Sequence, residues 1–117
     1  MRGIVVGGNI RCLLKLAGTK YWPDMDGKIL FLESRSGEAD RMTACLSQLK
    51  QMGVFEQISG ILLGTFTEME MKQCQPRIET LVKEMVGNKI PIAKTQEIGH
   101  GTDSKCLIIG EYAEFKN

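Results

Sequence analysis

The stretch KILFLES, residues 28–34, carries four consecutive apolar side chains and then ends at a carboxylate, Glu33. A short, continuous apolar run of this kind predicts a strand that is buried on both faces. Two similar runs, RGIVVGG at 2–8 and GILLGTF at 60–66, predict further buried strands. In α/β sheets, ligands usually meet the carboxyl ends of the strands, which makes Glu33 a candidate site residue.

Segments with helical spacing separate these strands. The first has Asn9 at the N-cap position, the second ends at Gly53, and the third lies between Pro76 and Gly87. Their apolar positions are Ile10, Leu13, Leu14 and Ala17; Met42, Cys45, Leu46, Leu49 and Met52; and Ile78, Leu81, Val82 and Met85. The later runs KIPIAKT, CLIIG and AEFK predict short strands, with AEFK paired to CLIIG through Gly110 and Glu111. The alternation predicts an α/β layered domain with a partly parallel sheet and about three helices.

Composition narrows the class of protein. The 117 residues are 43% hydrophobic and 25% charged with a formal net charge of +1, which is typical of one soluble domain. No basic stripe favours nucleic acid as a partner, and no apolar segment is long enough to span a membrane. We therefore expect no nucleic-acid partner, no membrane association and a cytoplasmic location.

The four cysteines, Cys12, Cys45, Cys74 and Cys106, are widely spaced and form no C-x-x-C pair. Because there is only one histidine, neither zinc spacing nor a redox motif is present, and we expect reduced thiols, no metal and no cofactor. A cysteine nucleophile assisted by the histidine remains an alternative, but no motif around any cysteine supports it.

The single histidine, His100, lies between two glycines in EIGHGTD, residues 97–103. It could be a structural surface residue. If it meets Glu33, however, the carboxylate and imidazole form two thirds of a nucleophile, base and orienting triad. Candidate nucleophiles are serines 34, 36, 47, 59 and 104, and none occupies a G-x-S-x-G turn. The residues alone thus indicate an incomplete catalytic machine, or no catalysis.

The segment GGN, residues 7–9, supports two compatible interpretations. Gly7 and Gly8 can form the strand-to-helix turn while Asn9 caps the helix. The same turn can line a substrate cleft, with Gly8 and Asn9 available to bind a ligand. A phosphate-binding turn is a weaker alternative because the G-x-G-x-x-G and Walker spacings are missing. We expect Trp22, in the loop GTKYWPDMDG, to pack against the core.

Four ordered segments resemble the C-terminal domain of the LD-carboxypeptidase family, which comprises muramoyltetrapeptide carboxypeptidases and microcin C self-immunity peptidases. They are VGGN, LAGTKYWPDMDGKILFLE, DRMTACLSQLKQMGVFEQISGILLGTF and IGHGTDSKCLIIG, and they cover nearly the whole chain. The resemblance implies a swivelling β/β/α-type domain. Where members of the family commonly have Leu-Pro before the closing glycine, this chain has Ile108 and Ile109.

The resemblance also implies a function. In that family a serine of an N-terminal domain, absent from these 117 residues, acts with a histidine and a glutamate of the C-terminal domain. These correspond to His100 and Glu33 here. The implied reaction is release of D-alanine from murein tetrapeptides by a homodimer without a metal, and the isolated chain is expected to be inactive. A non-catalytic binding or interaction module of the same fold is the alternative, and the choice between murein peptides and peptide-nucleotide antibiotics stays open.

Overall fold

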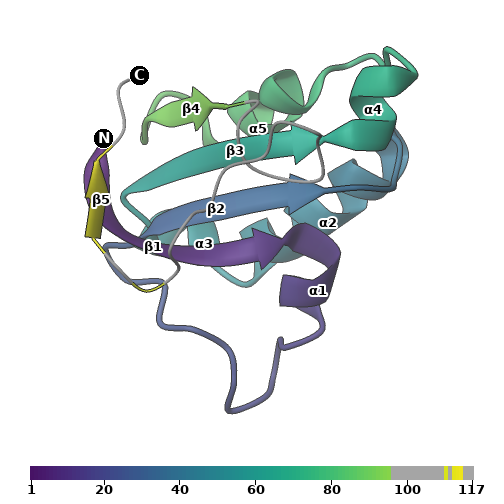
Figure 1. Ribbon diagram of the computed structural model, residues 1–117. Helices are drawn as coiled ribbons and strands as arrows, with labels where there is room; N and C mark the ends of the chain where they lie inside the picture. The colour runs from purple at the N-terminus through teal and green to yellow at the C-terminus, as the bar shows by residue number, and fades with distance from the viewer. Residues whose placement is uncertain (96–109, 111, 115–117) are drawn as a thin grey trace.

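The computed structural model describes residues 1–95, 110 and 112–114, which form a five-stranded sheet (Figure 1). The strands are β1 (Arg2–Asn9), β2 (Ile29–Ser34), β3 (Gly60–Phe66), β4 (Ile92–Lys94) and β5 (Tyr112–Glu114). Their order is β4-β3-β2-β1-β5. The first four are mutually parallel, and β5 runs antiparallel to β1. The predicted α/β domain with a partly parallel sheet is confirmed.

The described residues also form five helical segments, which are α1 (Ile10–Leu14), α2 (Ala39–Gln51), α3 (Val54–Gln57), α4 (Thr67–Met71) and α5 (Ile78–Val86). In Figure 1, α2, α3 and α5 lie together behind the sheet. Leu46 and Leu49 of α2 and Leu81 of α5 share one buried cluster with Leu30 and Leu32 of β2. Helices therefore cover one face of the sheet.

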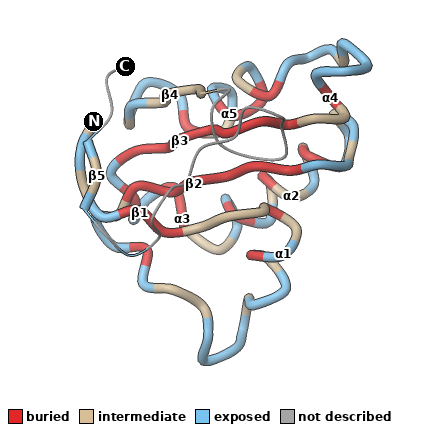
Figure 2. Tube along the Cα trace, in the orientation of Figure 1, coloured by how far each residue is buried: buried red, intermediate tan, exposed pale blue. Residues whose placement is uncertain are grey.

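Strand β2 is buried along its whole length, as its continuous apolar run predicts (Figure 2). Leu30 and Leu32 face the helices, whereas Ile29 and Phe31 belong to a second cluster on the opposite face with Val5 and Leu62. Alternate side chains of a strand point to opposite faces, so both faces of β2 carry apolar packing.

Some elements differ from the sequence prediction. Helix α1 ends at Leu14, before Ala17, and the chain turns through Gly18, whose φ is 79°. The short helices α3 and α4 were not predicted, because four or five residues are too few to show helical periodicity. Strand β5 begins at Tyr112, one residue before the predicted AEFK, and pairs with β1. The predicted pairing with CLIIG falls on residues outside those described.

Trp22 is half-buried and packs against the larger apolar cluster, between the sheet and the helices, as predicted. Cys45 and Cys74 are free thiols partly buried against the same core, and Cys12 is a free thiol at the surface. Cys106 lies outside the described residues. Within the described part of the chain, none of the helices has the length and apolar character needed to cross a membrane.

Candidate functional site

Glu33 lies at the carboxyl end of β2, on the sheet face opposite the helices. Alternation along the strand places its side chain with Ile29 and Phe31 rather than with Leu30 and Leu32. Only 7% of the residue is exposed. Burying a carboxylate is costly without hydrogen-bond donors, and every buried side-chain nitrogen and oxygen of the described residues has a partner. Glu33 is thus a buried carboxylate at the end of a strand, and its buried oxygen atoms have hydrogen-bond partners.

Asn9 lies directly beside Glu33, because the parallel register of β1 and β2 pairs these two residues. Its side chain also caps α1, since Asn9 Oδ1 accepts hydrogen bonds from the backbone N–H groups of Arg11 at 3.0 Å and Cys12 at 3.1 Å. The predicted N-cap is confirmed. The start of α1 and the candidate carboxylate therefore lie side by side at the carboxyl ends of β1 and β2.

The two glycines before Asn9 have different environments. A Cβ at Gly7 would collide with the backbone carbonyl oxygen of Phe31, and its φ of 120° disfavours other residues. Gly8, with φ of 149°, has no atom of the described residues within 4 Å of the position a Cβ would take. Gly7 permits close approach of β1 to β2, whereas no described residue crowds the position next to Asn9 where Gly8 lacks a side chain.

A β-bulge interrupts the ladder between β2 and β3 beside Glu33. Leu32 pairs with Leu63, but Ser34 pairs with Phe66, so Gly64 and Thr65 together oppose Glu33. Both opposing residues are buried. Bulges commonly redirect a side chain or end strand pairing next to active sites. The bulge therefore determines which backbone atoms of β3 lie next to Glu33.

Two charged residues bind the backbone around this bulge. Lys94 Nζ, at the end of β4, donates a hydrogen bond to Gly64 O at 2.7 Å and lies 3.2 Å from Glu70 Oε2. The same carboxylate oxygen accepts a hydrogen bond from the Phe66 backbone N–H at 2.7 Å. Sequence reasoning missed Lys94 and Glu70, because no local pattern signals a contact between residues 24 positions apart.

The loop after β2 is tied down by side chains from two helices. Ser34 Oγ donates to Ser36 O at 2.7 Å, and Ser36 Oγ accepts from Arg11 Nη1 at 2.9 Å. Gly37 N–H donates to Glu68 Oε1 at 2.9 Å. Among the described candidate nucleophiles, Ser34 and Ser36 thus have their hydroxyls engaged within this loop. Ser47 lies in α2, and Ser59 lies at the amino end of β3.

Among the residues that the structure describes, three ionisable groups have shifted pKa values. The Gly37 N–H and Lys72 lower the pKa of Glu68, while the hydrogen bond to Glu68 and the charge of Glu38 raise the pKa of Lys72. Burial raises the pKa of Cys45 despite the nearby Arg11 and Arg41. A raised thiol pKa disfavours the reactive thiolate, which argues against Cys45 as a nucleophile.

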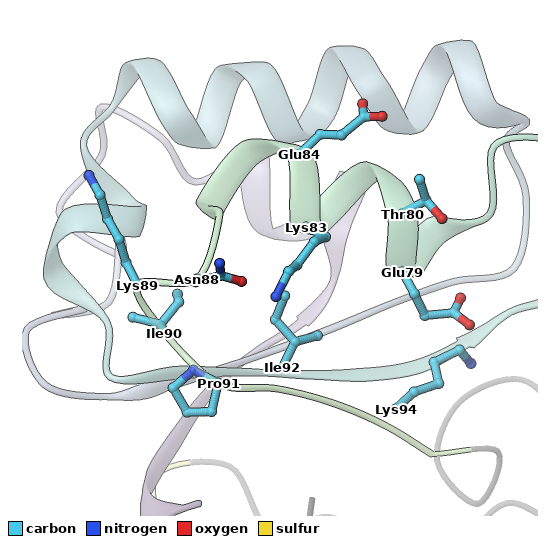
Figure 3. Close-up of a pocket in the computed structure, with 10 residues that line it drawn as sticks. All are labelled: Glu79, Thr80, Lys83, Glu84, Asn88, Lys89, Ile90, Pro91, Ile92 and Lys94. Carbon is cyan, nitrogen blue, oxygen red and sulfur yellow. The ribbon is translucent and has the colours of Figure 1, made fainter.

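A groove of about 800 Å³ runs between α5 and β4 (Figure 3). It is lined by Glu79, Thr80, Lys83, Glu84, Asn88, Lys89, Ile90, Pro91, Ile92 and Lys94. Ile92 packs against the helix-side core, whereas Glu33 faces the other side of the sheet. The groove and the candidate carboxylate therefore lie on different faces.

Three of the four predicted site residues, Gly8, Asn9 and Glu33, lie together at the carboxyl ends of β1 and β2. His100 lies outside the described residues, so its approach to Glu33 stays a prediction. The described residues contain no group of three metal-ligating side chains that could hold an ion.

A family model of the LD-carboxypeptidase C-terminal domain matches residues 2–115. The chain belongs to the LD-carboxypeptidase family. A relative in Bacillus subtilis, named a probable murein peptide carboxypeptidase, is 29% identical over 95% of this chain and 36% of its own length. The microcin C7 self-immunity protein MccF of Escherichia coli is 28% identical over 94% of the chain and 33% of its own.

Solved structures agree with this membership in the LD-carboxypeptidase family. The crystal structure of a muramoyltetrapeptide carboxypeptidase from Oxalobacter formigenes has a TM-score of 0.79 and 27% identity, and it covers 96% of this chain and 40% of that protein. The chain therefore spans 33 to 40% of the length of these three relatives.

Proposed function

We propose that this chain supplies Glu33 and His100 to the Ser-His-Glu triad of a serine carboxypeptidase. The enzyme hydrolyses the amide bond between an L-configured centre and a terminal D-alanine in murein tetrapeptides. The observation that carries the proposal is the buried carboxylate of Glu33 at the end of a parallel strand, beside Asn9, in a chain of the LD-carboxypeptidase family. The serine would come from a domain N-terminal to residues 1–117.

The proposed mechanism gives each residue one role. His100 takes the proton of the serine hydroxyl as the oxygen attacks the peptide carbonyl, and returns it to the leaving amine of D-alanine. Glu33 accepts a hydrogen bond from the imidazole, fixes its tautomer and stabilises the imidazolium. The burial of Glu33 supports this role, because the interaction between two charges is stronger where water is excluded.

Gly8 and Asn9 are proposed to bind the substrate. The cap of α1 uses Asn9 Oδ1, and the side-chain amide nitrogen is a donor suited to a peptide carbonyl or carboxylate. Gly8 lacks a side chain, and no described residue fills the position that a Cβ would take, which suits the backbone of a ligand. The full enzyme is further proposed to act in the cytoplasm as a homodimer, without a metal or cofactor.

The test uses the longer protein that carries these residues and measures release of D-alanine from a murein tetrapeptide. His100→Ala should lower kcat by several orders of magnitude, and Glu33→Gln by up to about 10⁴-fold, because the ring loses its tautomer and its charge partner. Glu79→Gln is the control, since Glu79 pairs with Arg77 at the surface, away from Glu33.

Two results would overturn the proposal. Full activity in His100→Ala would show that the reaction needs no triad containing His100. Turnover that requires an added metal would show a metal-dependent mechanism instead. Either result would favour the non-catalytic module for this chain. A peptide-nucleotide substrate assayed in parallel decides the substrate class, because cleavage of that substrate alone would contradict the murein assignment.

A further inference from the structure

We propose that Lys94 and Glu70 are positioning residues that hold Glu33 in register through the bulge of β3. The inference deepens the proposed function and rests on it for the role of Glu33. Neither residue is proposed to contact the substrate. Both act on the backbone that faces Glu33.

Backbone N–H and C=O groups beside the bulge need hydrogen-bond partners outside the regular strand ladder. An extra residue in one strand disturbs the ladder locally, and buried backbone groups beside it must find other partners. Gly64 O receives the ammonium group of Lys94, and the Phe66 N–H donates to the carboxylate of Glu70, both at 2.7 Å. The two side chains thus bind backbone groups on either side of Thr65, which opposes Glu33.

The two side chains also bind each other. Lys94 Nζ lies 3.2 Å from Glu70 Oε2, which is the oxygen that accepts the Phe66 N–H. Lys94 is only 18% exposed and Glu70 34% exposed, so this pair is less screened than a fully solvated one. The network joins the ends of β3 and β4 to α4.

Register near the bulge determines where Glu33 lies. Leu32 pairs with Leu63 before the bulge, and Ser34 pairs with Phe66 after it. This register is kept only while the extra residue of β3 remains opposite Glu33. Slippage by one residue would reverse the faces of the following side chains. A triad tolerates displacements of only about 0.5 Å, and a misplacement of about 1 Å costs roughly 10²-fold in rate.

The test replaces Lys94 by Met and Glu70 by Gln in the full-length protein. Lys94→Met should lower kcat by about 10- to 100-fold with KM within about twofold, because the substrate-binding groups are untouched. The pH at which kcat/KM falls to half on the acid side should shift as well. Lys94→Arg, which keeps the charge and the donors, should recover most of the lost kcat. Glu70→Gln should show a smaller loss of the same kind.

Lys28→Met is the matched control. Lys28 is 23% exposed, and its ammonium group lies 3.4 Å from a backbone carbonyl, Asp26 O, and 3.7 Å from a carboxylate, Asp24. It lies at the other end of β2, so its loss removes a similar set of contacts without touching the bulge. It should leave kcat and the pH profile unchanged.

Crystal structures of the variants give a readout that needs no activity. In Lys94→Met the Glu33 carboxylate should move by more than about 0.5 Å relative to β1. An unmoved carboxylate, or wild-type kcat and pH profile in folded Lys94→Met, would overturn the inference even if Glu33→Gln is inactive. If Glu33→Gln is instead fully active, the proposed function fails, while the crystal structures still decide whether Lys94 positions Glu33.

Discussion

Gly7 shows how one residue sets the distance between β1 and β2. It pairs with Phe31 in the parallel register, and a methyl group at its Cα would meet the Phe31 carbonyl oxygen. Two residues further along, the same pair of strands brings Asn9 beside Glu33. The geometry of the candidate site therefore depends on a side chain being absent at Gly7.

Gly7→Ala should be strongly destabilising, and Gly8→Ala less so. Gly7→Ala combines a backbone conformation that alanine avoids with a collision, which together cost about 2–5 kcal/mol. Gly8→Ala is expected to carry the conformational cost alone, about 1–3 kcal/mol, since no atom of the described residues lies within 4 Å of its methyl group. Urea unfolding of the two variants measures the difference, and equal losses would contradict the close approach at Gly7.

Among the elements, long apolar patterns were predictable from the sequence, and features that depend on tertiary contacts were not. Strands β2 and β3 and helices α2 and α5 follow directly from their apolar spacing. The pairing of β5 with β1 and the bulge opposite Glu33 have no local signal. The same holds for the candidate site. Asn9 and Glu33 could be predicted because they lie at the ends of strands with clear apolar patterns. Lys94 and Glu70 could not, because their proposed role depends on the register of β3.

The contact between α4 and the loop after β2 should make stability depend on pH through Glu68. The Gly37 N–H and Lys72 lower its pKa below the ordinary 4.5, so its contribution is present above that value and is lost as the pH falls through the folded-state pKa. The pKa of Lys72 is raised above 10.5, so its contribution is lost only as the pH rises through the higher folded-state value.

Glu68→Gln should therefore be less stable than the wild type at pH 7, and the difference should shrink towards pH 3. Urea unfolding at both pH values measures it. Glu56→Gln is the control, because Glu56 and Lys89 are 3.8 Å apart and 75% exposed, and such pairs contribute little. A loss in Glu68→Gln that is the same at pH 3 and pH 7 would show that the charge of Glu68 does not hold the loop.

On the scale of the whole molecule, the covering helices and the candidate carboxylate lie on different faces of the sheet. The helices α2 and α5 cover one face with the larger apolar cluster, and the groove of Figure 3 opens on that side. Glu33 faces the other side, beside the start of α1 and the loop held by Glu68. A domain of this kind can fold around its own core and still present the candidate carboxylate to a second domain.

The 117-residue chain should therefore fold cooperatively and yet release no D-alanine. Its buried apolar side chains include Leu46, which is fully buried in α2, so Leu46→Ala should cost about 2–5 kcal/mol in the free energy of unfolding. Coincident transitions by circular dichroism and fluorescence would establish the fold, so that a lack of activity cannot be ascribed to an unfolded sample.

The expected lack of activity follows from the proposed position of the serine nucleophile in another domain. With the proposed serine in another domain, His100 and Glu33 have no hydroxyl to activate, and loss of a triad nucleophile costs on the order of 10⁶-fold in rate. D-alanine release by the pure, folded chain would contradict this and would place the nucleophile within it. Ser34, next to Glu33, would then be the first residue to replace by alanine, because its hydroxyl is the nearest in sequence to the carboxylate.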